Sequence, residues 1–250
     1  MTTDDNGVSF DVNDWVARQA AAEAEAAKAA GFTDVDTYRE HCDAERAAEE
    51  AEQRREAAER RARAIRHDII PSRYREARLA DMTDGHLAAV RAWVDVFNDG
   101  IAPEPPGLFI VGPIGAGKTH LTYAIVDAVI DCLDAASRQP TIYRTTKLLR
   151  DLRPDSGFEH AEVIETCQNT TLLVLSDLGT EKPSEFTQEV MFEILDHRYE
   201  WKRPTIVTSN WPLQQLGEYV GERVTSRLRE MCATVPVVGA DRRKPPARTR

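Results

Sequence analysis

One octapeptide, GPIGAGKT at Gly112 to Thr119, constrains the fold of this chain more than any other segment. It matches the pattern G-x-x-x-x-G-K-[ST], follows the short apolar segment GLFIV and opens a segment whose apolar residues recur at helical spacing. Glycines let such a loop fold tightly enough for backbone N–H groups to surround phosphate oxygens, and the helix N-terminus adds partial positive charge. The octapeptide therefore predicts a strand, a phosphate-binding loop and a helix, in that order.

The chemistry of this loop gives its residues separate roles. We expect the ammonium of Lys118 to lie between the terminal phosphates and the hydroxyl of Thr119 to ligate Mg²⁺. The expected ligand is ATP or another purine triphosphate. The alternative, a glycine-rich turn with an incidental lysine, is disfavoured by the flanking strand and helix. The residues expected to bind the nucleotide are Gly112, Pro113, Ile114, Gly115, Ala116, Gly117, Lys118, Thr119 and His120.

Strand and helix signals alternate over residues 71–238. This alternation predicts an α/β core in which helices cover a parallel sheet. The expected strands are GLFIV, TIYR, TLLVLSDL, PTIVTSN and TVPVV. The expected helices are residues 85–97, KTHLTYAIVDAVIDCL, TTKLLRDLR, FEHAEVIETCQ, TQEVMFEILDHRYE and GERVTSRLREM.

Residues 1–70 differ in character, because Ala, Glu and Arg dominate them and β-branched residues are rare. They predict two helices: Asn13 or Asp14 can cap the first, Gly31 ends it, and Asp34 or Asp36 can start the second. The second helix carries Glu residues four positions before Arg, as in Glu50–Arg54, Glu56–Arg60 and Glu59–Arg63. Its apolar residues are mostly alanine, which suits either a solvated helix or a docking arm for a partner, and we favour the arm.

Composition limits the remaining possibilities. A net charge of −10 gives no general attraction for nucleic acid, so any DNA contact needs a local basic surface. The four cysteines follow no metal-binding or disulfide pattern, and we interpret them as buried thiols. No apolar run approaches the about 20 residues that cross a bilayer, and the acidic N-terminus does not resemble a signal peptide. We therefore expect no membrane contact and a cytoplasmic location. The basic segment 239–250 is expected to be disordered.

Two later strands end in polar residues. LLVLSDLG, Leu172 to Gly179, indicates a buried strand that runs into a turn and carries a single acid. TIVTSN ends at Asn210, which could orient an attacking water near the terminal phosphate. Ligands of such sheets collect at the carboxyl ends of the strands, so we expect both segments to lie near the phosphate-binding loop.

Taken together, GPIGAGKTHL, LLVLSDLGTEKP, HRYEWKRPTIVTSN and GERVTSRL resemble the AAA+ ATPases of the DnaC type, the replicative helicase loaders, and the related IstB transposition helpers. The resemblance covers roughly Ile70 to Met231. It implies an AAA+ P-loop core with an all-α N-terminal extension. It also implies an ATPase that delivers a ring-shaped DnaB-type helicase onto single-stranded DNA, with the arm gripping the helicase. A transposition helper would have the same chemistry and a transposase as its partner.

The resemblance implies roles for several basic residues. Arg227, in the Ser-Arg-Leu step, looks like an arginine finger that reaches the nucleotide of a neighbouring subunit, and Arg223 could share this task one helical turn away. A finger in trans implies self-association. Lys147, Arg150 and Arg153 are spaced by three and would form a stripe that follows the phosphates of single-stranded DNA. The alternative for both sets is ordinary exposed basic residues on surface helices.

The sequence departs from the family pattern at Ser176, where an Asp usually stands before the acid that prepares the water. On this pattern Thr119, Ser176 and Asp177 would lie at the metal, and Asp177 would be the catalytic acid. Neighbouring strand residues point to opposite faces, so Asp177 could replace the missing acid only through a bulge or a twisted strand end, and the pattern predicts neither. We expect ATP binding to survive and hydrolysis to be slow. A non-hydrolysing, nucleotide-gated adaptor is the alternative.

Overall fold

The computed structural model describes residues 2–3, 9–10, 12–82, 87–132, 140–153 and 160–238. The chain forms two compact units, Met1–Ala57 and Ala58–Arg250. The predicted arm was expected to end at residue 70. Helix α2 does end at Ile69, but the boundary between the units lies inside that helix. The basic segment 239–250 lies outside the described residues.

The first unit contains the pair β1 (Thr2–Thr3) and β2 (Ser9–Phe10), helix α1 (Val12–Ala29) and the start of α2 (Val35–Ile69). Gly31 ends α1 as predicted: its φ is +88°, and the N–H of Phe32 donates to the carbonyl of Ala27. Asp34 caps α2, since its carboxylate accepts from the N–H of Thr37 at 2.8 Å. The predicted cap at Asn13 or Asp14 is wrong, because α1 already begins at Val12.

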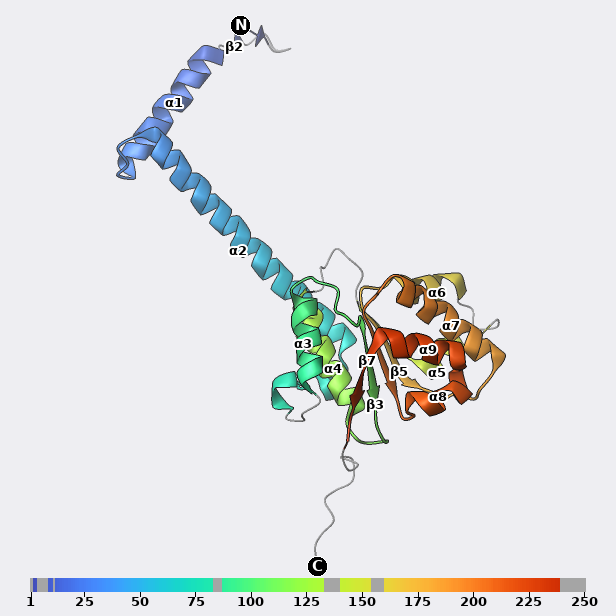
Figure 1. Cartoon of the computed structure of the whole chain (residues 1–250). Helices are drawn as coiled ribbons and strands as arrows, with labels where there is room; N and C mark the ends of the chain where they lie inside the picture. The colour runs from blue at the N-terminus through green and yellow to red at the C-terminus, as the bar shows by residue number, and fades with distance from the viewer. Residues whose placement is uncertain are drawn as a thin grey trace, which may run out of the picture. The chain divides into compact units, whose positions relative to one another are not determined.

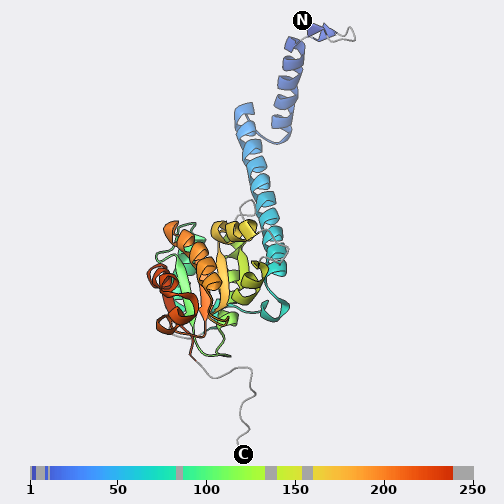
Figure 2. The same cartoon turned by 90° about the vertical axis from the view of Figure 1, so that its right-hand side faces the viewer.

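The second unit is built on a five-stranded parallel sheet in the order β4-β5-β6-β3-β7 (Figure 1, Figure 2). All five predicted strands are confirmed. Their bounds are β3 Gly107–Val111, β4 Thr141–Arg144, β5 Leu173–Leu178, β6 Thr205–Ser209 and β7 Cys232–Pro236. Because β3 lies next to β6, and β6 next to β5, their carboxyl ends meet at one edge of the sheet.

Helices cover both faces of this sheet (Figure 1). α3 (Leu87–Asn98) and α4 (Lys118–Val129) lie on one face. The other face carries α5 (Thr145–Asp151), α6 (His160–Asn169), α7 (Glu185–Glu200), α8 (Leu213–Val220) and α9 (Glu222–Met231). Short 3₁₀ turns occur at η1 (Ser72–Tyr74), η2 (Leu79–Asp81) and η3 (Ile130–Cys132). Helix α8 was not predicted, since it is short and begins directly after Pro212.

The strands alternate between the two layers of the core. Leu108 and Ile110 of β3 pack with α3 and α4, whereas Phe109 packs with the helices of the opposite face. This arrangement explains the uninterrupted apolar runs, because each strand is covered on both sides.

Two cysteines, Cys167 and Cys232, are buried, and burial raises the pKa of each thiol to about 12. The interpretation of all four cysteines as buried is wrong, because Cys132 is exposed.

Within the second unit, the last turns of α2 are fixed to α4. The Nε of Arg66 donates to the carboxylate of Asp127 at 2.5 Å, and Arg78 approaches the same carboxylate at 3.4 Å. Asp127 is nearly buried, so its charge is offset by two guanidinium groups. Ile65 packs into the core beside this ion pair. α4, which begins at the phosphate-binding loop, therefore has a rigid contact with the end of α2.

No helix in the described part of the chain combines the length and apolarity that a bilayer span needs.

A fully buried arginine, Arg198 of α7, joins three elements on the opposite face. Its guanidinium donates to the carbonyls of Cys167, Gln168 and Thr170 at the end of α6. It also donates to the carbonyl of Pro204 and the hydroxyl of Thr205 at the start of β6. Burial, followed by the charge of Arg203, lowers the pKa of Arg198. Because every acceptor is neutral, this residue fixes the end of α6 and the start of β6 by hydrogen bonds.

We expect Arg198→Met to lower the free energy of unfolding by about 3 kcal/mol or more, because several buried carbonyls lose their donor. Urea unfolding of the full chain measures this loss. Arg229→Met is the matched control, since Arg229 is exposed on α9. Equal unfolding midpoints for the two variants would contradict the role given to Arg198.

Candidate functional site

The phosphate-binding loop has the backbone that its glycines allow. Gly115 and Gly117 have φ values of +84° and +108°, in the left-handed region that L-residues with side chains rarely adopt. A Cβ at Gly112 would lie 2.2 Å from the carbonyl oxygen of Val237. The loop therefore needs glycine at these positions, as a loop that approaches phosphate closely does.

Lys118 begins α4 and is buried, with 6% of its surface exposed. Its ammonium donates to the carbonyls of Gly112 at 2.7 Å and Pro113 at 3.0 Å. It also donates to the side-chain oxygen of Asn210 at 2.7 Å. Asn210 follows β6, so the ammonium joins the phosphate-binding loop to the neighbouring strand. The expectation that the end of β6 lies near the phosphate-binding loop is therefore confirmed.

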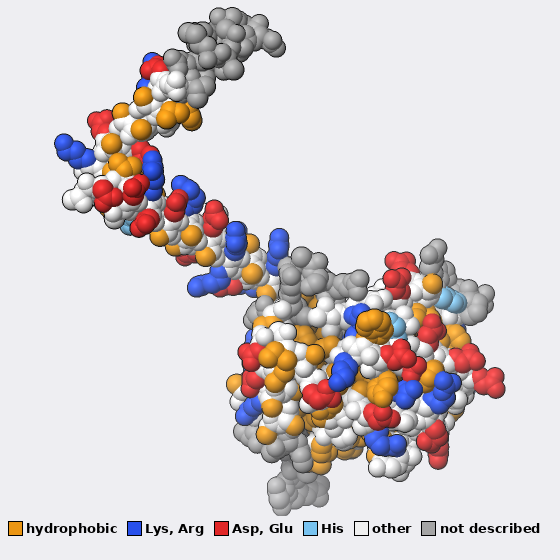
Figure 3. All heavy atoms as spheres, turned by 45° about the horizontal axis from the view of Figure 1, so that its top comes forward, with side chains coloured by type: hydrophobic (Ala, Val, Ile, Leu, Met, Phe, Trp, Pro, Cys, Tyr) orange, Lys and Arg blue, Asp and Glu red, His pale blue; other side chains and the backbone are white. Residues whose placement is uncertain are grey.

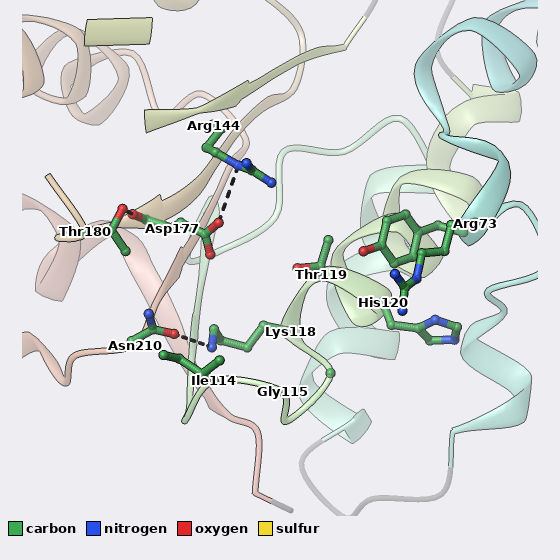
Figure 4. Close-up of a pocket in the computed structure, with 12 residues that line it drawn as sticks. Arg73, Ile114, Gly115, Lys118, Thr119, His120, Arg144, Asp177, Thr180 and Asn210 are labelled. Carbon is green, nitrogen blue, oxygen red and sulfur yellow. Dashed lines mark hydrogen bonds and ion pairs between the residues drawn. The ribbon is translucent and has the colours of Figure 1, made fainter. Parts of the chain in front are cut away.

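A pocket of about 490 Å³ opens above Lys118 (Figure 4). Arg144, Asp177 and Thr180 lie on one side of Lys118 and Thr119, and Arg73 and His120 lie on the other (Figure 4). Its volume is in the range of ordinary ligand sites. The lining residues are Arg73, Tyr74, Ile114, Gly115, Gly117, Lys118, Thr119, His120, Arg144, Asp177, Thr180 and Asn210.

Asp177 reaches this pocket through a bulge. The register between β5 and β6 shifts between Leu175 and Leu178, and Asp177 has a φ of +63°. A left-handed residue inside a strand end turns the following chain and re-aims its own side chain. Asp177 lines the phosphate pocket as a result. The sequence pattern did not predict this bulge.

Polar groups after β5 and at the end of β6 hold the bulge. Thr208 Oγ1 accepts from the N–H of Asp177 at 3.0 Å, and Ser209 Oγ donates to the carbonyl of Leu178 at 2.7 Å. The indole N–H of Trp211 donates to the carbonyl of Gly179 at 3.0 Å. The carboxylate of Glu181 accepts from the N–H of Gly179, and burial raises the pKa of Glu181. The Thr-Ser-Asn-Trp segment therefore satisfies backbone groups that leave the regular ladder.

Ser176 is turned toward the neighbouring strand. Its hydroxyl donates to the carbonyl of Tyr143 on β4 at 3.2 Å, and its own carbonyl accepts from Thr145 Oγ1. Ser176 lines a second pocket, of about 510 Å³, together with Thr119 and Asp177. The three residues predicted for the metal side thus lie together. This second pocket is lined by Pro71, Tyr74, Thr119, Tyr123, Ile142, Arg144, Thr146, Lys147, Arg150, Ser176 and Asp177.

Four pocket residues escaped the sequence analysis. Arg144 ends β4, and its Nε lies 3.6 Å from the carboxylate of Asp177. Its place at the carboxyl end of a strand next to β5 was the signal that could have found it. Thr180 donates to the carbonyl of Asp177. Arg73 and Tyr74 come from η1, and no motif marks that segment.

The basic residues predicted for DNA are all exposed, but they do not form one helical stripe. α5 ends at Asp151, so Arg153 lies beyond the helix. Lys147 and Arg150 line the second pocket, and Arg153 does not. The spacing argument fails at Arg153 because it requires a helix that continues for another turn.

The two predicted finger arginines lie on α9, and neither lines the phosphate pocket of its own chain. The Nε of Arg227 donates to Asp196 at 2.6 Å, and its guanidinium carbon lies 4.5 Å from the centre of the Tyr199 ring. Arg223 lies over Phe192 at 3.6 Å.

The donor set of the pocket fits a nucleoside triphosphate with a divalent cation. The loop supplies backbone N–H groups and an ammonium, Thr119 supplies a hydroxyl, and Asp177 supplies a carboxylate. Among the described residues, no group of three or more His, Cys, Asp or Glu side chains could hold a metal ion. A cation here would therefore need phosphate oxygens as further ligands, as Mg²⁺ does in nucleotide sites.

Comparisons with known proteins agree with this geometry. The replicative helicase loader DnaC of Escherichia coli K12 is 27% identical over 143 residues, which cover 57% of this chain and 56% of the relative. The chain thus matches little more than half the length of the curated relatives. A crystal structure of the DnaC helicase loader has a TM-score of 0.57 and 28% identity, covering 67% of this chain and 100% of the other. A crystal structure of DnaI has a TM-score of 0.57, 26% identity and coverages of 70% and 94%.

AMPPCP-bound DnaA from Aquifex aeolicus has a TM-score of 0.52 at 21% identity, with coverages of 65% and 50%, and this likeness shows the AAA+ fold alone. The model of the family described as IstB-like ATP binding protein matches residues 43–247. This match includes the phosphate-binding loop, the bulged strand and the arginine-bearing helix α9. The chain therefore belongs to the family of IstB-like ATP binding proteins, and its core has the AAA+ fold.

Proposed function

We propose that this protein is an ATP-binding helicase loader, which assembles on a ring-shaped, DnaB-type replicative helicase in the cytoplasm and delivers it onto single-stranded DNA. The observation that carries this proposal is the pocket in which Lys118, Thr119, Asp177 and Asn210 converge, in a chain similar to DnaC loaders. An IstB-like transposition helper is the alternative, with the same pocket chemistry and a transposase as its partner.

The residues of the pocket have complementary roles toward ATP. The loop amides and Lys118 bind the phosphates, and Thr119 and Asp177 would hold Mg²⁺, which neutralises charge on the transferring phosphoryl group. Asn210 and Asp177 stand where an attacking water could be oriented. The ammonium of Lys118 donates to the carbonyls of Gly112 and Pro113 and to the side-chain oxygen of Asn210, which hold it at the floor of the pocket.

Turnover is expected to be slow, because one carboxylate occupies a position where the family pattern has two. Asp177 can assist a cation or accept a proton from water, and Ser176 contributes no charge to either task. The guanidinium of Arg144, with its Nε 3.6 Å from the carboxylate of Asp177, competes with a metal ion for the same carboxylate. This pair favours, as a second candidate function, an adaptor that binds ATP and assembles without hydrolysing it.

We expect Asp177→Asn to retain ATP affinity within about threefold, but to reduce phosphate release to the level of a Lys118→Ala control. Ser176→Asp should raise turnover by about tenfold or more, because it restores a carboxylate near Thr119. Calorimetry measures the affinity, and steady-state phosphate release with Mg²⁺, helicase and single-stranded DNA measures turnover. A wild-type rate equal to that of Lys118→Ala would exclude the ATPase and leave the adaptor.

For single-stranded DNA, we propose a contact through Lys147 and Arg150. Both are exposed on α5 and line the second pocket, and Arg144 lines it as well. Three basic side chains around one pocket give the local positive surface that an acidic chain needs to bind phosphates. Arg153, beyond the helix end, would extend this surface only as an additional contact.

We expect Lys147→Glu combined with Arg150→Glu to weaken binding of single-stranded DNA by about tenfold or more at low salt, and equally for different base sequences. The salt dependence should also become less steep by about 1.4 in log–log slope, since two phosphate contacts are lost. Fluorescence anisotropy measures both. Lys202→Glu with Arg229→Glu is the control with the same charge change, and an equal loss there would contradict a local contact.

For the helicase, we propose docking through residues 1–70. Acidic and basic side chains alternate along the described helices of this region (Figure 3). Their ion pairs, such as Glu50–Arg54, let α2 remain helical in water. α1 exposes two large apolar residues, Trp15 at 50% and Val16 at 51%, which are the kind of side chains that anchor protein interfaces.

We expect Trp15→Asp with Val16→Asp to weaken capture of the helicase by the full chain by about tenfold or more, with ATP affinity unchanged. Trp201→Asp is the matched control, because Trp201 is 66% exposed on the core. A pull-down with purified helicase and a calorimetric ATP titration measure the two quantities. Capture of a transposase in place of the helicase would overturn this choice of partner.

A further inference from the structure

In the residues that the structure describes, the guanidinium of Arg227 is bound to the protein through its Nε, whereas its two terminal nitrogens are not. Its Nε donates to Asp196 Oδ1 at 2.6 Å, and its guanidinium carbon lies over the Tyr199 ring, 4.5 Å from the ring centre. Within the described part of the chain, neither terminal nitrogen of Arg227 has a hydrogen-bond or ion-pair partner. About a third of the side chain remains exposed. The two terminal nitrogens are thus available to an acceptor outside the chain.

The ring under Arg227 is itself fixed. The hydroxyl of Tyr199 donates to the carboxylate of Glu230 at 2.7 Å, and Ser226 donates to the other oxygen of the same carboxylate at 3.3 Å. Tyr199 lies on α7, whereas Ser226 and Glu230 lie on α9 with Arg227. These bonds join the two helices around the arginine, so its direction is set by two elements of the fold.

Arg223 lacks this support. Its guanidinium lies over Phe192, in a groove of about 600 Å³ between α7 and α9. Among the described residues, no carboxylate lies within ion-pair distance of Arg223. The two candidate finger arginines therefore differ in how they are held. Arg227 is fixed by the carboxylate of Asp196, whereas Arg223 has, in the described part of the chain, only the contact with the Phe192 ring.

We propose that Asp196 and Tyr199 are positioning residues, which hold Arg227 ready to contact the phosphates bound by a second copy of this chain. This inference rests on the proposed function, in which α9 contributes an arginine to a neighbouring pocket. An arginine that is ordered before assembly loses less conformational freedom when it meets its phosphate. The carboxylate uses Nε alone and leaves the two terminal nitrogens to grip oxygens of a phosphate.

The alternative is an inhibitory ion pair, here called a latch, in which Asp196 keeps Arg227 from contacting the phosphates of the second copy. A latch would be strongest as a bidentate pair in which two guanidinium nitrogens meet both carboxylate oxygens. Arg227 shows a single contact to one oxygen of Asp196, which leaves its outer edge unused. The two readings predict opposite effects of removing the carboxylate charge: turnover falls if Asp196 positions Arg227 and rises if Asp196 withholds it.

The test mixes two full-length variants in one assembly with helicase and single-stranded DNA. Arg227→Ala retains the nucleotide pocket but lacks the guanidinium, and Lys118→Ala lacks phosphate binding but retains Arg227. Each alone should be inactive. The mixture should recover activity, because Arg227 of one copy serves the pocket of the other. Asp196→Asn is then added to the copy that carries Lys118→Ala.

We expect this addition to lower the recovered kcat by about tenfold or more, with KM for ATP within about twofold. The same Asp196→Asn placed in the Arg227→Ala copy should change nothing, because that copy supplies no finger. Tyr199→Leu in the Lys118→Ala copy should give a smaller loss in the same direction. Asp196→Glu there should restore part of the activity, and Glu193→Gln, an exposed acid of α7, should leave it unchanged.

The dissociation rate of a fluorescent ATP analogue from the assembled mixture is a second readout, which applies even if the chain binds ATP without hydrolysing it. Both readouts unchanged by Asp196→Asn in the Lys118→Ala copy, or a kcat that rises, would overturn the positioning role and leave the arginine finger standing. No recovery in the first mixture, by either readout, would refute the finger in trans and this inference with it. Thermal melts of each variant establish that it is folded.

Discussion

The carboxylate of Asp177 faces the phosphate pocket only because the chain leaves the regular pleat of β5 before that strand ends. In a regular strand, Ser176 and Asp177 would point to opposite faces of the sheet. The left-handed conformation of Asp177 breaks this alternation. The hydroxyl of Thr208 accepts from the N–H of Asp177, and Ser209 and Trp211 donate to the carbonyls of the next two residues. A left-handed residue with a side chain is unfavourable by itself, so these contacts must outweigh its cost.

This bulge also marks where sequence reasoning ends. The phosphate-binding loop, the five strands and the helices with strong apolar periodicity could be predicted, because each is specified by residues close together in the chain. The bulge depends on hydroxyls about thirty residues further along the chain, on β6. The pairing of β6 with β5 is part of the tertiary structure and cannot be inferred from neighbouring residues. Arg144 was missed for the same reason: its meaning comes from the strand order, which places β4 beside β5. Arg73 and Tyr74 carry no local signal at all.

Helix α4, which begins at the phosphate-binding loop, also anchors the end of α2. α4 begins at Lys118 and, further along, carries Asp127, which is paired with Arg66 of α2 and with Arg78. A nearly buried carboxylate between two guanidinium groups resists separation, because removal of either partner leaves charge in a poorly solvated place. Any displacement of α4 on phosphate binding must therefore be shared with the last turns of α2.

Slow turnover in a lone chain would then have two separable physical origins. One lies inside the pocket, where a single carboxylate paired with Arg144 stands in place of two acids. The other lies outside it, because Arg227 projects from α9 and does not line its own phosphate pocket. Electrostatic stabilisation of a phosphoryl-transfer transition state depends on charges already in place. If Arg227 acts in trans, as proposed above, a pocket without a neighbour lacks one of these charges. Assembly can supply the second deficit but not the first. Slow hydrolysis that persists in the complete assembly would therefore point to Ser176 and Arg144, whereas slow hydrolysis confined to the monomer would point to α9.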